Sequence, residues 1–241
     1  MKHFIVLLVA AISAYAHPAD VDYFGWDGRI VYEASSIKSE GLKGVSKCMS
    51  DAAQYVYVGV PSALYTYGVV ASALDQPTAD RRYASETGIQ ALTSLGITYG
   101  IAVATKIIVD RERPYLAYPG LIANGEGPEN DKYLSSFPSG HSAGAAAIAT
   151  TMMLRYPKWY VIAPSVGYAL WMGFSRLNLG VHYLTDVLAG YAIGAGVAYG
   201  VHVVSKELFN VAEPILPAGV GLAVGMAGTP TTPLFTISMN F

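Results

Sequence analysis

The stretch that decides the fold, residues 138–154, reads PSGHSAGAAAIATTMML and contains no Asp, Glu, Lys or Arg. Its run of small apolar residues, 142–154, lacks the period-two alternation of a half-buried strand, so we predict a helix there. Ser139 and Gly140 then lie where the helix begins, and free backbone N–H groups and the positive end of the helix dipole favour an anion at that point. His141 falls in the first turn, beside this predicted anion seat.

Four further segments have the same apolar character. They contain no charged residue except Lys106 and span residues 52–74, 88–109, 159–174 and 187–204. They are long, rich in Ala and Gly, and show no strand periodicity. The sequence therefore predicts an all-α fold, a helical bundle with five apolar core helices.

Two observations favour a bundle embedded in a membrane. Two of the segments exceed about 20 residues, the length needed to cross a bilayer. The last segment carries Gly190, Gly194 and Ala198 at the spacing that lets membrane helices approach closely. Against this prediction, 142–154 and 159–174 are short for spans, and a soluble bundle can bury equally apolar helices, so both placements stay open.

Three cationic side chains lie at the ends of these apolar segments. Lys106 and Arg113 belong to KIIVDRERP (106–114), and Arg176 to SRLNLGVHYLTD (175–186), in a chain with only 13% charged residues. A phosphoryl group spreads its charge over three oxygens, so a site that binds it needs several fixed cations and amide donors. Arginine offers a planar fork and lysine a point charge. The sequence predicts a dianionic ligand.

His182 and Asp186 are four residues apart, a spacing that stacks two side chains on one face of a helical turn. A carboxylate bonded to one imidazole nitrogen fixes the tautomer and leaves the other nitrogen bare for attack. We interpret the pair as a nucleophile and its orienting group. Alone, it also fits an ordinary paired helix face.

Together, these stretches resemble the signature of the type 2 phosphatidic acid phosphatase superfamily, which includes lipid phosphate phosphatases, bacterial class A acid phosphatases and vanadium haloperoxidases. The family pattern is Lys, six residues, Arg-Pro; then Pro-Ser-Gly-His; then Ser-Arg, five residues, His, three residues, Asp. The chain matches every defined position, in order, and the resemblance covers roughly residues 50–205.

The resemblance implies a role for each matched residue. His182 would attack phosphorus to form a phosphohistidine, Asp186 would orient it, and His141 would protonate the leaving group. The phosphate oxygens would be held by Lys106, Arg113, Ser139, Gly140 and Arg176. No metal or cofactor is implied, although vanadate or phosphate could occupy the pocket. Arg111, inside the first stretch but outside the family pattern, is interpreted as a solvated or paired neighbour.

These features predict a metal-independent phosphatase that acts on a terminal phosphate of a lipid phosphate or isoprenoid pyrophosphate. Three alternatives stay open: a soluble periplasmic acid phosphatase for small phosphomonoesters, a vanadium-dependent haloperoxidase, and a non-catalytic membrane scaffold. The expected partners are the phosphorylated lipid and the bilayer. A nucleic-acid partner is not expected, because the net charge is -2 and no basic stripe exists outside the three stretches.

The two ends of the chain differ from the bundle. Residues 1–16 have the form of a secretory signal, with an uncleaved anchor as the alternative. We expect 17–51 to lie on the outer surface, 52–206 to form the phosphatase domain, and 207–241 to be a tail with a β-hairpin, because apolar residues alternate there. The predicted location is the cell envelope, either the inner membrane with an outward-facing site or the periplasm.

Overall fold

The computed structural model describes residues 25–74, 78–118, 121 and 135–215 of the chain, with side chains described up to residue 206. Seven helices lie in these ranges: α2 (Gly25–Ser35), α3 (Glu40–Leu74), α4 (Ala79–Val109), α5 (Pro114–Ala117), α6 (Gly140–Arg155), α7 (Trp159–Asn178) and α8 (Leu184–Ile215). The described part contains no strand beyond a single bridge between Glu112 and Ser135. The helical fold class is therefore confirmed.

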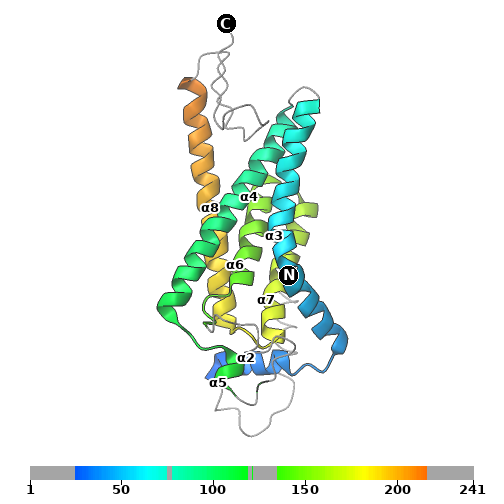
Figure 1. Ribbon diagram of the computed structural model, residues 1–241, viewed down its shortest axis with the longest axis vertical. Helices are drawn as coiled ribbons and strands as arrows, with labels where there is room; N and C mark the ends of the chain where they lie inside the picture. Colours follow the sequence, from blue (N-terminus) through cyan, green and yellow to red (C-terminus); the bar gives the residue numbers. More distant parts are fainter. Residues whose placement is uncertain (1–24, 75–77, 119–120, 122–134, 216–241) are drawn as a thin grey trace, which may run out of the picture.

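All five apolar segments lie within helices, namely α3, α4, α6, α7 and α8. These helices run along the long axis of the molecule, with α6 near the middle, while α2 lies across the lower end in the view of Figure 1. The predicted signal segment and C-terminal hairpin lie outside the described residues. The boundary that we expected between residues 51 and 52 falls inside α3, which begins twelve residues earlier at Glu40.

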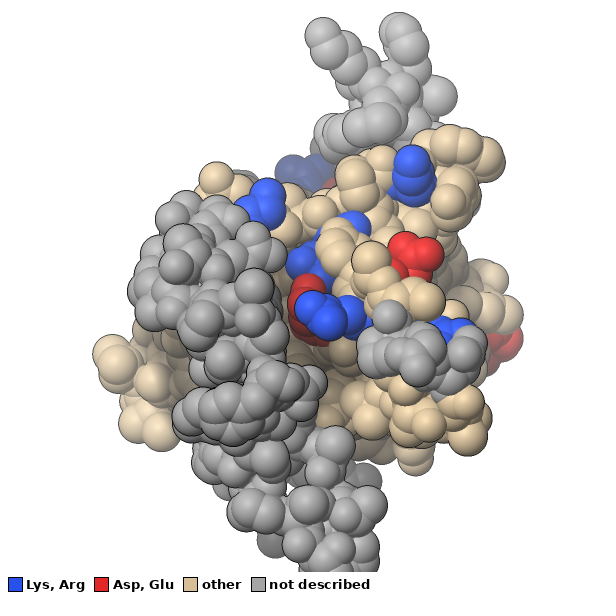
Figure 2. All heavy atoms as spheres, turned by 90° about the horizontal axis from the view of Figure 1, so that it is seen from above, with Lys and Arg blue, Asp and Glu red and all other residues tan. Residues whose placement is uncertain are grey.

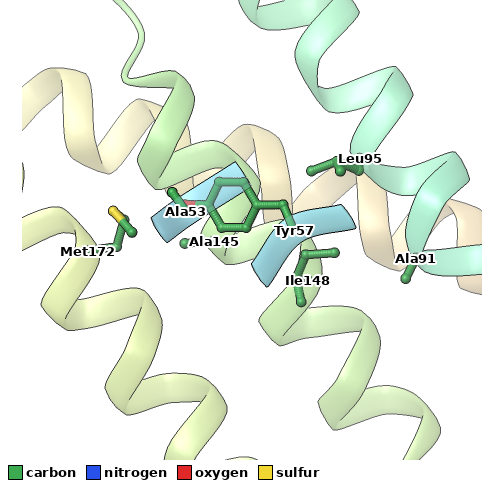
Figure 3. Close-up of a cluster of buried hydrophobic side chains, with 7 residues drawn as sticks. All are labelled: Ala53, Tyr57, Ala91, Leu95, Ala145, Ile148 and Met172. Carbon is green, nitrogen blue, oxygen red and sulfur yellow. The ribbon is translucent and has the colours of Figure 1, made fainter. Parts of the chain in front are cut away.

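The helices meet at a core of small residues and one large aromatic ring. Ala145 and Ile148 of α6 pack with Tyr57 of α3, Leu95 of α4 and Met172 of α7. Figure 3 shows Tyr57 at the centre of this cluster. Since alanine adds little side-chain volume, the Ala-rich helix α6 can be surrounded closely by its neighbours.

Two glycines of α8 bring that helix against α6. A Cβ atom added at Gly190 would lie 2.6 Å from the carbonyl oxygen of Ser139, and one at Gly194 would overlap the carbonyl of Ala143. Both contacts are with backbone, which cannot move aside as a flexible side chain can. The small residues of α8 therefore set the distance between the helix that carries Asp186 and the helix that carries His141.

Three of the described helices, α3, α4 and 184–206 of α8, are long and apolar enough to cross a membrane, as judged by length and composition. Their outward surfaces carry many large apolar side chains, including Ile97 and Val103 of α4 and Tyr199 of α8. Large apolar side chains exposed in such number are a feature of surfaces that contact a partner or a membrane. These side chains form the surface that a lipid environment would cover.

Candidate active site

The predicted anion seat lies at the start of α6. Ser139 is the N-cap residue, and its hydroxyl oxygen accepts the backbone N–H of Ser142 at 3.3 Å. The backbone N–H of Ser139 donates to the carbonyl of Asp186 at 3.0 Å, which joins this cap to the first turn of α8. Gly140 has no side chain to block the approach of a ligand to the helix start.

The connection after α4 brings the cations of the first stretch to the same end of the bundle. Helix α4 ends at Val109, and its C-cap residue Asp110 adopts the left-handed conformation (φ 43°) that Asp tolerates better than most residues. Arg113 is buried and donates to the carbonyl of Val181 at 3.5 Å. Lys106 reaches the carbonyl of Ser135 at 2.7 Å, immediately before the 138–141 stretch.

Arg176 approaches from the end of α7 and is almost fully buried, with 1% of its surface exposed. Its Nε donates to the hydroxyl of Ser175 at 3.3 Å, and its carbonyl accepts the N–H of Val181 at 3.2 Å. Its charge, held close to the start of α6, would attract an incoming phosphate.

His182 follows α7 and faces Asp186, as the four-residue spacing predicts. The distance from His182 Nδ1 to Asp186 Oδ2 is 3.5 Å, a close charge contact that is longer than an ordinary hydrogen bond. Asp186 is fully buried, and the same oxygen accepts the backbone N–H of Tyr183 at 2.9 Å. The carboxylate thus lies on the Nδ1 side of the ring, which leaves Nε2 for another partner.

The surroundings keep both histidines neutral. Burial is the main cause that lowers the pKa of His182 to about 4; the positive charges of Arg113 and Lys106 also lower it, while Asp186 opposes them. The pKa of His141 falls to about 3, again mainly through burial, and then through Arg176, His182 and Arg113. All three predicted cations therefore act electrostatically on the two imidazoles.

Helix α3 holds His141 in a way that the sequence did not reveal. The hydroxyl of buried Tyr57 donates a hydrogen bond to the carbonyl of His141 at 2.7 Å. The His141 ring in turn donates to the backbone carbonyl of Ser50. A cavity of about 580 Å³ opens beside this histidine, lined mainly by polar and aromatic residues: Ser50, Asp51, Ala53, Gln54, Tyr55, Tyr57, Tyr99 and His141. This cavity offers space next to the predicted proton donor.

Two further charged residues, Arg111 and Asp27, belong to the site. Arg111 Nη1 donates to Asp186 Oδ1 at 2.7 Å, and Arg111 Nη2 to Asp27 Oδ2 at 3.0 Å. We expected Arg111 to be solvated or paired, and it is paired, with the predicted orienting carboxylate. Asp27 lies in α2, outside every motif, so no local signal in the sequence pointed to it.

The eight predicted site residues lie on the turns and helix ends at one end of the bundle, the end that α2 crosses (Figure 1). Hydrogen bonds from Lys106, Arg113 and the backbone of Ser139 join the three stretches to one another. Within the described residues, no group of three or more His, Cys, Asp or Glu side chains could hold a metal ion. The individual catalytic roles and the metal-independent reaction stay predictions.

Comparison with known proteins identifies the family. The family model described as the PAP2 superfamily matches residues 87–209, just over half of the chain. The chain belongs to the PAP2 superfamily. The decaprenylphosphoryl-5-phosphoribose phosphatase of Mycolicibacterium smegmatis is 34% identical over 151 residues, which cover 62% of this chain and 74% of that protein. The resemblance predicted from the three stretches is confirmed.

Other relatives match over shorter segments. The lipid A 1-phosphatase of Rhizobium johnstonii is 42% identical over 60 residues, 25% of this chain and 24% of that protein. The chain spans between a quarter and about half of the length of the first curated relatives that it matches. These matches support the family, and the substrates named for the relatives belong to those proteins.

A solved structure shares the fold. The transmembrane PAP2 type phosphatidylglycerolphosphate phosphatase from Bacillus subtilis superposes with a TM-score of 0.55 at 24% identity, covering 85% of this chain and 94% of that chain. At this identity the likeness shows the fold alone. It agrees with the three described helices that are long and apolar enough to span a membrane.

Proposed function

We propose that the chain is a membrane-embedded phosphatase that removes a terminal phosphate from a lipid phosphate or isoprenoid pyrophosphate through a phosphohistidine. The observation that carries the proposal is the pair of neutral imidazoles, His141 and His182, close to the start of α6. The positive charges of Lys106, Arg113 and Arg176 act on one or both of these rings. This arrangement combines a nucleophile, a group that can pass a proton to the leaving oxygen, and an anion seat.

The first half of the reaction uses His182 and Asp186. The lone pair of His182 Nε2 attacks phosphorus, and the bond from phosphorus to the ester oxygen breaks. The ester arrives as a monoanion, and its remaining proton passes through neutral His141 to that oxygen. Asp186 stabilises the positive charge that develops on the imidazole of His182, because its carboxylate lies on the Nδ1 side. The leaving alcohol or phosphate occupies the cavity beside His141.

The second half returns the site to its starting state. Water attacks phosphorus, and its proton passes through His141 to the departing phosphate. The phosphorus–nitrogen bond breaks, which releases inorganic phosphate and leaves both imidazoles neutral. The phosphate oxygens stay between Arg113, Arg176, Lys106 and the backbone N–H groups at the start of α6 throughout both halves. A binding site that is fixed in this way stabilises the charge of each transition state without reorganisation.

The molecular surface and the relatives support the proposed substrate class. Relatives are named as phosphatases of lipid A, of decaprenylphosphoryl-5-phosphoribose and of undecaprenyl diphosphate, all of which carry a phosphate on an amphiphile. The apolar outer faces of α3, α4 and α8 suit a site reached from a bilayer. We infer that this chain also acts on a phosphorylated amphiphile.

Charge distribution supports an outward-facing site. Lysine and arginine side chains lie across the end opposite α2, with acidic side chains among them (Figure 2). The α3–α4 turn is followed by Arg81 and Arg82, and the α6–α7 turn is flanked by Arg155 and Lys158. Positive loops stay in the cytoplasm. The site at the other end of the bundle would then face the outside of the inner membrane.

Phosphate release by the purified chain tests the proposal. The wild-type chain in detergent should release phosphate from at least one of phosphatidic acid, phosphatidylglycerophosphate and undecaprenyl pyrophosphate, faster than from a soluble monoester. His182→Ala should lower the rate by a factor of at least about 10⁴ and abolish acid-labile labelling of the protein by ³²P-labelled substrate.

A second buried histidine provides the matched control. His202 belongs to α8, and its Nδ1 is 3.2 Å from Gln90 Nε2 of α4. It lies more than four helical turns beyond Asp186, which is about 24 Å along the helix. His202→Ala should retain phosphate release in proportion to the folded protein. Equal activity in the His182→Ala chain, or peroxide-dependent halide oxidation with added vanadate in place of hydrolysis, would contradict the proposal.

A further inference from the structure

The carboxylate of Asp186 has a partner on each side. Its Oδ2 accepts the N–H of Tyr183 and faces His182, while its Oδ1 accepts from Arg111 at 2.7 Å. The side chain of Asp186 is fully buried, so it has no contact with solvent that could compensate for a lost partner. Arg111 therefore fixes, from the far side, the orientation of the carboxylate toward the imidazole.

Asp27 of helix α2 holds Arg111 in turn. The Asp27 carboxylate accepts from Arg111 Nη2 at 3.0 Å, from the backbone N–H of Thr185 at 3.2 Å and from the Thr185 hydroxyl. The guanidinium also lies over the ring of Tyr183, 3.7 Å from its centroid. Arg111 is thereby fixed by contacts with α2 on one side and the first turn of α8 on the other.

The order of charges in this chain of contacts is Asp27, Arg111, Asp186, His182. A buried carboxylate that loses its cation is strongly disfavoured, and one that turns away no longer fixes the imidazole. The simplest alternative is a tether that only holds α2 on the bundle, since Asn178 Nδ2 also donates to the carbonyl of Ala34 at 2.9 Å. A tether would change the amount of folded protein and not the turnover of each folded molecule.

We propose that Asp27 and Arg111 are positioning residues that align His182 through Asp186. The imidazole of His182 is then correctly oriented for attack only while helix α2 is packed against the rest of the bundle. The proposal rests on the proposed function, in which His182 attacks phosphorus. It assigns the N-terminal helix α2 to the catalytic machinery, although α2 lies outside the residues that match the family.

Kinetics of three variants test the alignment. Arg111→Met should lower kcat by about 100-fold with KM within about twofold of wild type, because misplacing a reacting group costs rate and leaves the phosphate seat intact. Arg111→Lys should recover about tenfold of that loss, and Asp27→Asn should lower kcat by about tenfold. Each kcat is expressed per folded molecule, measured by thermal unfolding. Unchanged kcat, or a change confined to KM, would overturn the proposal.

A second ion pair on α2 provides the matched control. Arg29 Nε and Glu33 Oε1 are 3.3 Å apart, one turn from each other, and Arg29 is 42% exposed. Arg29→Gln removes an ion pair from the same helix and should leave kcat and KM unchanged. A loss as large as that of Asp27→Asn would show that α2 acts only through its general stability, which would contradict the positioning role.

The ring nitrogens of His182 give a readout that needs no turnover. In ¹⁵N-histidine-labelled protein, the His182 signals, assigned by their loss in His182→Gln, should show a proton fixed on Nδ1. Arg111→Met should produce a mixture of tautomers, and Arg111→Lys should restore most of the wild-type pattern. Identical spectra would overturn the alignment. Absence of phosphate release by the wild-type chain would overturn the proposed function alone.

Discussion

His182 can stay neutral, and so remain a nucleophile, at a pH well below the usual range of histidine. Burial, Arg113 and Lys106 lower its pKa to about 4, against an ordinary value near 6.5. Burial, together with Arg176, His182 and Arg113, lowers the pKa of His141 to about 3, so we infer that the proton given to the leaving group arrives with a monoanionic ester. A phosphate ester loses its second proton near pH ~6.

The pH dependence of kcat/KM should therefore be bell-shaped. We expect the acidic limb near pH ~4, where His182 becomes protonated, and the alkaline limb at the second pKa of the ester, near ~6. Esters with more acidic phosphates should move the alkaline limb downward and leave the acidic limb in place. An acidic limb near 6.5 that does not depend on the substrate would show that His182 is not shielded as the structure indicates.

Residues with a fixed sequence spacing were predictable, and residues that act through tertiary contacts were not. His182 and Asp186 are four apart, so helical geometry alone places them together. Arg111 and Asp27 are 84 residues apart, and no pattern in the sequence around either residue predicts the ion pair between them. In the sequence, Tyr57 is one of many aromatic residues in an apolar segment. Only the structure shows that its hydroxyl donates a hydrogen bond to the carbonyl of His141.

At the scale of elements, the contact between α6 and α8 determines where the two halves of the site meet. The predicted small-residue spacing on α8 was informative because glycine permits backbone contact, and Gly190 and Gly194 face α6 in the structure. The boundary that we expected between residues 51 and 52 does not coincide with the start of α3 at Glu40. Residues 40–51 are mixed polar and apolar, and such a composition does not distinguish a surface loop from the polar end of a long helix.

Gly194→Ala should destabilise the protein and lower phosphate release. The new methyl group would overlap the carbonyl of Ala143 and lie 2.9 Å from the N–H of Ala147, so α8 must move away from α6. Overpacking of this kind costs about 1 to 3 kcal/mol. Thermal unfolding in detergent, followed by circular dichroism, measures the loss.

Gly196 is the control, because a Cβ there meets nothing within 4 Å. Gly196→Ala should be neutral, or should stabilise α8 by up to about 1 kcal/mol through the better helix propensity of alanine. Equal stability of the two variants would mean that α6 and α8 are less closely packed than the structure shows.

At the scale of the whole molecule, the predicted apolar segments lie in helices that expose large apolar side chains as well as burying them. The sequence identified the segments because they lack charge, but a groove between helices and a lipid-facing surface have the same composition. Only the fold separates them: Ala91 and Leu95 of α4 are buried in the core, whereas Ile97 is 46% exposed. The exposed set is what a bilayer would contact.

Ile97→Asp tests that assignment, since Ile97 lies in the middle part of α4, one of the candidate spans. A carboxylate at the centre of a membrane helix costs about 2.5 to 3.5 kcal/mol on insertion, whereas an exposed position of a soluble protein changes stability by about 0.5 kcal/mol or less. We expect little of the variant in the membrane fraction that remains after extraction with alkaline carbonate. Gly41→Asp, at the exposed start of α3, should accumulate like wild type. Recovery of an active Ile97→Asp chain in the soluble fraction would place this protein among the soluble members of its family.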